Sequence, residues 1–306
     1  MDIDEWIKED IQENRYKNYD KNNFTYGFEL EIGDVPRDIK IPKELGEWEY
    51  SERDVINLRN PYKLICCDPL GKDPPYGGEI NTKPTKTINE QINKILSIIE
   101  FFKENGYSPT TNCVSHNHIH IHVPKLVSDI KSLKLLTQYI KENQSYTVKK
   151  IYDFKPFPEI KQTGTTYYFK FDGGRLMPNW MCNNIINMSQ SFEDYIRLHS
   201  CGKDGKARAR PLRYAVNTYC LKHIKTVEFR FFRHSFNEEH LRSSFEFVKL
   251  FMDSALNKGP SVKTILNNNK FSFPKFIYNH EQCLAWKKTK YDSSRGKKER
   301  KFYEVN

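Results

Sequence analysis

The chain lacks the cysteine spacing of zinc knuckles and of disulfide scaffolds. Its seven cysteines are odd in number and scattered, and no two are spaced as C-x-x-C, so neither class is indicated. The charged N-terminal segment has no apolar stretch, and no apolar run approaches the length of a membrane span. We therefore expect neither a secretory leader nor contact with a membrane, and we expect a reducing, cytoplasmic location.

Aromatic residues, in contrast, are abundant. They make up 14% of the 306 residues, and hydrophobic residues make up 38%. A disordered chain would contain far fewer aromatics, so we expect a folded protein. The net charge is +10, and half of it lies in residues 286–306, where eight basic residues stand against three acidic ones. A second basic run spans residues 203–213. Such runs suit phosphates or polyanions, although a solvated basic surface explains the tail as well.

Hydrophobic periodicity predicts interspersed strands and helices. Strand patterns cover residues 24–32, 63–67, 78–82, 115–123 and 226–232. Helix patterns cover residues 88–105, 126–143 and 238–256, the first opened by a Thr87/Glu90 capping box and stopped by Gly106. Residues 213–220 fit either a helix or a strand. This mixture predicts an α+β fold whose sheet is mostly antiparallel.

Carboxylates occupy alternate positions of the first predicted strand. Glu29 and Glu31 point to one face, because successive side chains of a strand alternate. Two adjacent carboxylates repel each other unless a cation lies between them, and a solvated strand face is the alternative. Glu79, which follows two glycines, and Asp68, a weaker candidate, add to the acidic set.

Histidines and an acid–base pair recur with the same period of two. His118, His120 and His122 share one face of the strand at 115–123, a pattern suited to a metal or to phosphate, with an exposed histidine-rich strand as the alternative. Glu228 and Arg230 share a face of the strand at 226–232, where a structural ion pair is the alternative. If these strands join one sheet, several carboxylates face one another, which calls for more than one hard cation such as Mg²⁺.

In combination, these motifs resemble the amidoligase family, which comprises relatives of glutamine synthetase and of the glutamate–cysteine ligases. The matching segments follow the family's order over residues 27–232. They are Gly27-Phe28-Glu29-Leu30-Glu31, Asp68 with the run from Gly77 to Pro84, His120-Ile121-His122-Val123, Arg213 with Asn217, and Glu228-Phe229-Arg230.

The resemblance implies a glutamine-synthetase-like half-barrel sheet with flanking helices in residues 23–260, between a polar lead-in (1–22) and a basic extension (261–306). It implies an ATP-dependent ligase that joins a small-molecule or peptide acid to an amine through an acyl phosphate, with two or more Mg²⁺ ions. The implied metal ligands are Glu29, Glu31, Glu79, Glu228 and a histidine, with the choice among His118, His120 and His122 left open. The implied catalytic residues are Arg230, Arg213 and Glu228. The implied nucleotide or substrate contacts are Arg208, Arg210, Arg213, Asn217 and His122.

Two other functions fit part of the sequence. A metallohydrolase would bind Zn²⁺ or Mn²⁺ through the three histidines, but it leaves Glu228 and Arg230 without a role. A nucleic-acid-binding protein would use the net charge and the basic tail. The identities of the acid and the amine do not follow from the sequence.

Overall fold

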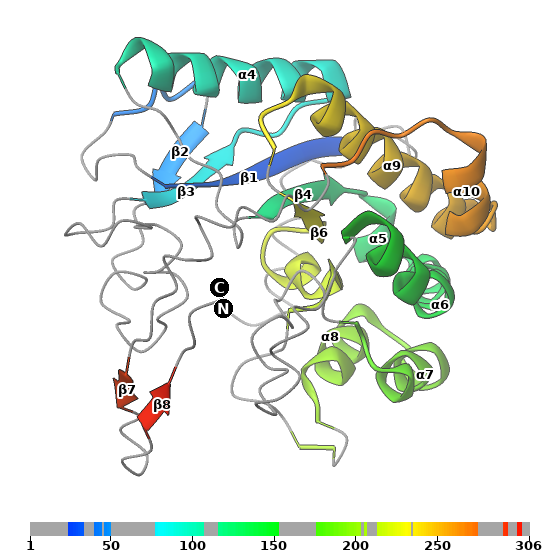
Figure 1. Cartoon of the computed structure of the whole chain (residues 1–306). Coiled ribbons are helices and arrows are strands. Elements are labelled where there is room, and N and C mark those ends of the chain that lie inside the picture. The colour runs from blue at the N-terminus through cyan, green and yellow to red at the C-terminus, as the bar shows by residue number, and fades with distance from the viewer. Residues whose placement is uncertain are drawn as a thin grey trace.

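The computed structural model describes a helix-covered sheet and a small C-terminal hairpin (Figure 1). The described residues are 24–33, 40–44, 46–49, 77–106, 116–152, 176–202, 205–206, 213–233, 235–274, 290–292 and 299–301. Of these, residues 31–33, 47–49, 77–79, 116, 152, 290–292 and 299–301 are described for the backbone alone. The predicted strand at 63–67 lies outside the described residues.

Strands and helices are interspersed along the chain, as the periodicity predicts. The strands are β1 (Thr25–Gly33), β2 (Gly46–Glu49), β3 (Gly77–Thr82), β4 (His116–His122), β5 (Val216–Asn217), β6 (Thr226–Arg233), β7 (Lys290–Asp292) and β8 (Glu299–Lys301). The α-helices are α4 (Ile88–Glu104), α5 (Lys125–Ser128), α6 (Ile130–Thr147), α7 (Asn179–Met188), α8 (Phe192–Ser200), α9 (Glu238–Asn257) and α10 (Val262–Asn268). The described residues also contain a π-helical turn (Val148–Tyr152) and a 3-10 helix (Thr218–Lys222).

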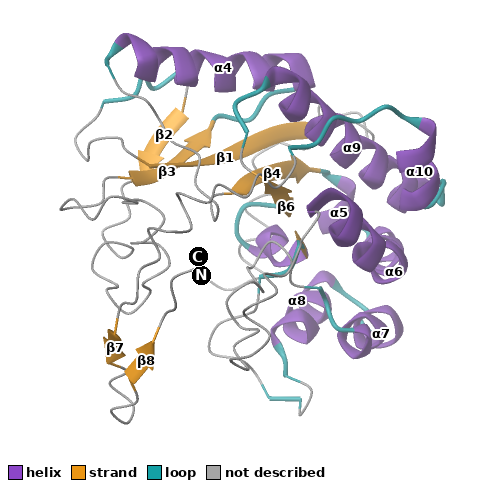
Figure 2. Cartoon of the chain, in the orientation of Figure 1, coloured by secondary structure: helices purple, strands orange, loops and turns teal. Residues whose placement is uncertain are grey.

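Within the described residues, the main sheet has six strands in the order β2-β3-β1-β4-β6-β5, and each neighbouring pair is antiparallel. Helices α4 and α9 lie over one face of this sheet, and α6 packs beside α9 (Figure 2). The prediction of an α+β fold with a mostly antiparallel sheet is therefore confirmed.

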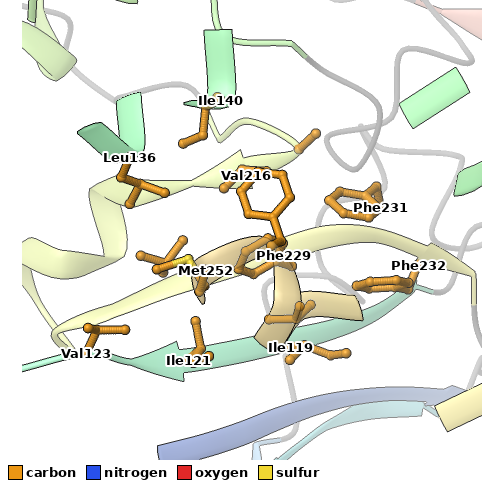
Figure 3. Close-up of a cluster of buried hydrophobic side chains, with 14 of the residues drawn as sticks. Ile119, Ile121, Val123, Leu136, Ile140, Val216, Phe229, Phe231, Phe232 and Met252 are labelled. Atoms are coloured by element: carbon orange, nitrogen blue, oxygen red, sulfur yellow. The ribbon is translucent and has the colours of Figure 1, made fainter. Parts of the chain in front are cut away.

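The helix-covered face buries the apolar half of each central strand. Phe28 of β1 is 2% exposed, and its ring centroid lies 5.8 Å from that of Phe245 on α9. Ile119 and Ile121 of β4 pack in the same layer as Phe229 of β6 (Figure 3). Burying one such side chain contributes about 1.5–3 kcal/mol, so this layer fixes which face each strand turns away from the helices.

Local signals set the ends of helix α4. Thr87 and Glu90 form the predicted capping box, with reciprocal side-chain to backbone hydrogen bonds of 3.2 Å. Gly106 follows the helix at φ +77°, a backbone conformation in which an L side chain is strained.

The helix predicted at 126–143 is wrong in its bounds. Asp129 breaks it into α5 and α6, because its side chain caps α6 by accepting hydrogen bonds from the Lys131 backbone N–H (3.0 Å) and the Ser132 hydroxyl (2.6 Å). Residues 213–220, left open between helix and strand, contain β5 and part of the 3-10 helix. Helices α7, α8 and α10 were not predicted.

The chain beyond residue 260 continues to pack on this core over residues 261–274. The Val262 backbone N–H donates to Oδ1 of Asn143 on α6 (3.0 Å). Phe271 and Phe273 stack with a ring-centroid separation of 5.5 Å, and Phe273 lies 6.1 Å from Phe232 of β6. Part of the basic extension predicted at 261–306 therefore contributes to the hydrophobic core.

Candidate metal-binding site

The face of the sheet opposite α9 brings together polar residues from three strands. In the ladder, Glu29 of β1 pairs with His118 of β4, and His120 pairs with Glu228 of β6. Because paired residues on adjacent strands share a face, these side chains meet on the side that Phe28 and Ile119 leave free. The period of two in each strand produces this cluster.

Glu29 makes the shortest contacts across β1 and β4. Its Oε2 lies 2.8 Å from Nδ1 of His118, and its Oε1 lies 2.8 Å from Nε2 of His120. Nδ1 of His118 also lies 3.5 Å from Oε1 of Glu228. Both carboxylates therefore lie beside the same nitrogen of one imidazole, which links β1 to β6.

Three side chains donate hydrogen bonds to the buried carboxylate of Glu228. Its Oε1 accepts from the guanidinium of Arg230, and its Oε2 accepts from Nδ2 of Asn217 (2.6 Å) and from the thiol of Cys220 (3.2 Å). Because buried carboxylates are costly unless they are hydrogen-bonded, this set of donors keeps the Glu228 carboxylate ionised in one orientation.

A β-bulge lies beside this pair. Asn117 pairs with Phe232 and Ile119 with Phe229, so Arg230 and Phe231 on β6 stand opposite the single residue His118. A bulge bends its strand and changes the direction of the local side chains. The backbone N–H of Arg230 donates to the carbonyl of Ala215 (2.9 Å), which attaches the bulged segment to the chain just before β5.

The charges of the cluster are mutually dependent. Burial raises the pKa of the Glu29 carboxyl, but contacts with His118 and His120 outweigh it and hold that pKa well below its usual range. Burial likewise raises the pKa of Glu228, and the charge of Arg230 is the main cause of its net lowering. Burial lowers the pKa of His120, yet the Glu29 carboxylate raises it overall. Both carboxylates are therefore ionised at neutral pH.

The donor set fits a divalent cation. Glu29, His120 and Glu228 each offer a ligand atom, and these atoms lie within 4.8 Å of one another. Nε2 of His120 is buried and lies 2.8 Å from Oε1 of Glu29. Among the described residues, no group meets the geometry of a hydrogen bond to this nitrogen. Two carboxylates and one imidazole suit Mg²⁺ or Mn²⁺ better than a thiolate-preferring metal.

The three histidines predicted as a set do not converge on one point. Nδ1 of His118 lies against Glu29, Nδ1 of His120 lies 2.9 Å from Oγ1 of Thr226, and Nδ1 of His122 donates to the carbonyl of Lys225 (3.0 Å). Their common strand face is confirmed, but Nδ1 of each ring contacts a different partner.

The other predicted site residues occupy varied positions. Asn217 joins the cluster through Glu228. Glu31 pairs with Glu79 in the β1–β3 ladder, two positions from Glu29, and only the backbone of both is described. Arg213 is exposed and lies three residues before β5. Asp68, Arg208 and Arg210 lie outside the described residues.

Two residues of the site were not predicted from the sequence. Cys220 donates to Glu228 from the 3-10 helix, and burial together with the Glu228 charge raises the pKa of its thiol, so the thiol stays protonated. Thr226 contacts His120 from the first position of β6. A sequence signal exists only for Thr226, which precedes Glu228 by two residues and therefore shares its strand face.

Comparisons with known proteins give little beyond this geometry. No family model and no curated protein matches the chain. A solved structure to which it is similar is a bifunctional glutathione synthetase from Pasteurella multocida, with 15% sequence identity and a TM-score of 0.36. The similarity covers 87% of this chain and 43% of that one. A TM-score this low supports no conclusion about fold or activity. Within the described residues, no helix is both long and apolar enough to cross a bilayer.

Proposed function

We propose that the chain is an ATP- and Mg²⁺-dependent carboxylate–amine ligase, with a sheet of the glutamine-synthetase-like kind. The observation that carries the proposal is the meeting of Glu29, His120 and Glu228 from three antiparallel strands beside the buried Arg230. The ordered resemblance of residues 27–232 to the amidoligase family supports the same reading. Its substrates would be a small-molecule or peptide acid and an amine.

In this proposal, Glu29, His120 and Glu228 hold one Mg²⁺, and the pair Glu31 and Glu79 contributes to a second. Such ions would supply positive charge to offset the charge of the nucleotide phosphates. The surrounding donors support this role, because Asn217 and Cys220 fix one oxygen of Glu228 and His118 fixes one oxygen of Glu29. Such outer contacts orient ligands before a cation arrives.

Arg230 is assigned to the transferring phosphoryl group. Its side chain is 7% exposed and is held by Glu228, so the guanidinium is oriented before substrate binds. A planar guanidinium offers two parallel donors to phosphate oxygens. Arg213, with Arg208 and Arg210 of the basic run, is assigned to the nucleotide phosphates or the acid substrate.

The reaction proceeds in two steps. A carboxylate oxygen of the acid attacks the γ-phosphorus of ATP, the bond to the β-phosphate oxygen breaks, and ADP leaves. The amine then attacks the acyl carbon of the acyl phosphate, loses a proton and expels inorganic phosphate as the amide forms. Negative charge spreads over the transferring group in the first step, where a preorganised arginine stabilises it most.

The experiment is phosphate release from ATP and Mg²⁺ across a panel of acids and amines. The proposal expects release that requires both an acid and an amine. Glu228→Gln should abolish it, and Glu238→Gln should not, because Glu238 is an exposed glutamate on α9 that pairs with Arg242. Release that needs neither co-substrate, or that survives Glu228→Gln, would reject the ligase.

A further inference from the structure

The ring of His120 spans two strands. Its Nδ1 lies 2.9 Å from Oγ1 of Thr226 on β6, and its Nε2 lies 2.8 Å from Oε1 of Glu29 on β1. The histidine is 6% exposed, so water does not substitute freely for either partner. The orientation of this ring therefore depends on these two contacts, and the contact at Nδ1 is the one made by a residue outside the proposed metal ligands.

Thr226 differs from the anchors of the other two histidines. Nδ1 of His118 contacts a carboxylate of the cluster, and Nδ1 of His122 donates to a backbone carbonyl. For His120 the Nδ1 anchor is a side chain outside the set of proposed metal ligands. That anchor shares a strand face with Glu228, so β6 supplies both a ligand and the group that orients another ligand.

We propose that Thr226 is a positioning residue that holds His120 with its proton on Nδ1 and its Nε2 lone pair toward the cation. This inference rests on the metal site of the proposed function. The Thr226 hydroxyl accepts from Nδ1–H, and this leaves Nε2 as the only ring atom able to bind a metal. Residues that orient a metal ligand in this way typically change metal affinity by ~10–100-fold.

Three variants separate positioning from a general structural role. Thr226→Val replaces the hydroxyl with a methyl group of similar size, and Thr226→Ser keeps the hydroxyl. Thr25→Val is the matched control, because Thr25 and Thr226 flank His122 as its ladder partners on β1 and β6. Thermal melting of each variant establishes that it is folded.

The first measurement is Mn²⁺ affinity without nucleotide, followed by electron paramagnetic resonance of free Mn²⁺. Thr226→Val should bind ~10–100-fold more weakly than wild type, and Thr226→Ser and Thr25→Val should bind close to wild type. The second is the ¹⁵N spectrum of the His120 ring in the Mg²⁺-saturated wild-type protein, which should show the proton on Nδ1.

Equal Mn²⁺ affinity of wild type and Thr226→Val would overturn the inference, as would a wild-type His120 with its proton on Nε2. The spectrum needs no variant, so it decides the matter even if Thr226→Val fails to fold. Mn²⁺ binding that depends on Thr226, in a protein without acid- and amine-dependent phosphate release, would reject the ligase and keep the positioning role. Normal acid- and amine-dependent phosphate release, together with Mn²⁺ binding that does not depend on Thr226, would keep the ligase and reject the positioning role.

Discussion

Replacement of Arg230 by lysine distinguishes a phosphoryl-binding arginine from a structural ion pair. The guanidinium is buried, and one of its nitrogens contacts Oε1 of Glu228. A lysine ammonium keeps the charge and can reach the same oxygen, so only part of the hydrogen bonding is lost. We expect a stability loss of about 1 kcal/mol, the net value of one hydrogen bond. For a domain of this size, that lowers Tm by about 2–4 °C.

Turnover should respond far more strongly. Lysine lacks the planar pair of donors that fits two phosphate oxygens. Loss of one preorganised donor to the transition state typically reduces kcat by ~10²–10³-fold. We therefore expect Arg230→Lys to fold and to bind ATP nearly as wild type does, while its phosphate release falls by that factor.

Thermal melting and steady-state phosphate release on one purified variant provide the assay. Arg242→Lys is the matched control, because Arg242 is more exposed and pairs with Glu238 within α9; it should leave turnover unchanged. The reasoning is refuted if Arg230→Lys loses about 3–5 kcal/mol of stability, the cost of breaking a buried pair, and keeps full turnover per folded molecule.

Three further predictions concern the site and the tail. Glu29→Gln should abolish turnover and weaken Mn²⁺ binding with little effect on folding, because Glu29 touches both His118 and His120; an active variant at ordinary Mg²⁺ would remove Glu29 from the site. Mn²⁺ affinity should rise as pH rises through the raised pKa of His120, because a proton on Nε2 must leave before a cation binds there; a titration that shows no dependence on pH would contradict this. Deletion of residues 287–306 should preserve the fold and ATP binding, and should flatten the salt dependence of any polyanion binding; an unfolded product would show that the tail is structural.

The strands and the long helices could be predicted because the sequence patterns that specify them lie within each segment. Alternation in β1, β4 and β6 indicates which face of each strand turns toward the helices, and the capping box indicates where α4 begins. The break at Asp129 was not predicted, because an aspartate in an amphipathic pattern looks like any exposed polar residue of a helix. Only the structure shows that its side chain caps the first turn of α6.

The site was only partly predictable, because its geometry depends on strand register. The sequence places Glu29 and His120 on strand faces, but only the ladder brings the two side chains into contact. The bulge at Arg230 and the thiol of Cys220 depend on pairing between β6, β4 and the segment before β6. No periodicity within one segment encodes such pairings.

Transfer of oxygen from the acid to phosphate tests the central claim most directly. An acid substrate found in the panel would be labelled with ¹⁸O in its carboxylate and incubated with ATP, Mg²⁺ and the amine. In the proposed reaction one carboxylate oxygen attacks the γ-phosphorus and leaves with it, so each amide formed should yield one phosphate that carries ¹⁸O. Unlabelled phosphate, formed in step with ADP, would contradict the acyl-phosphate ligase and identify water as the acceptor.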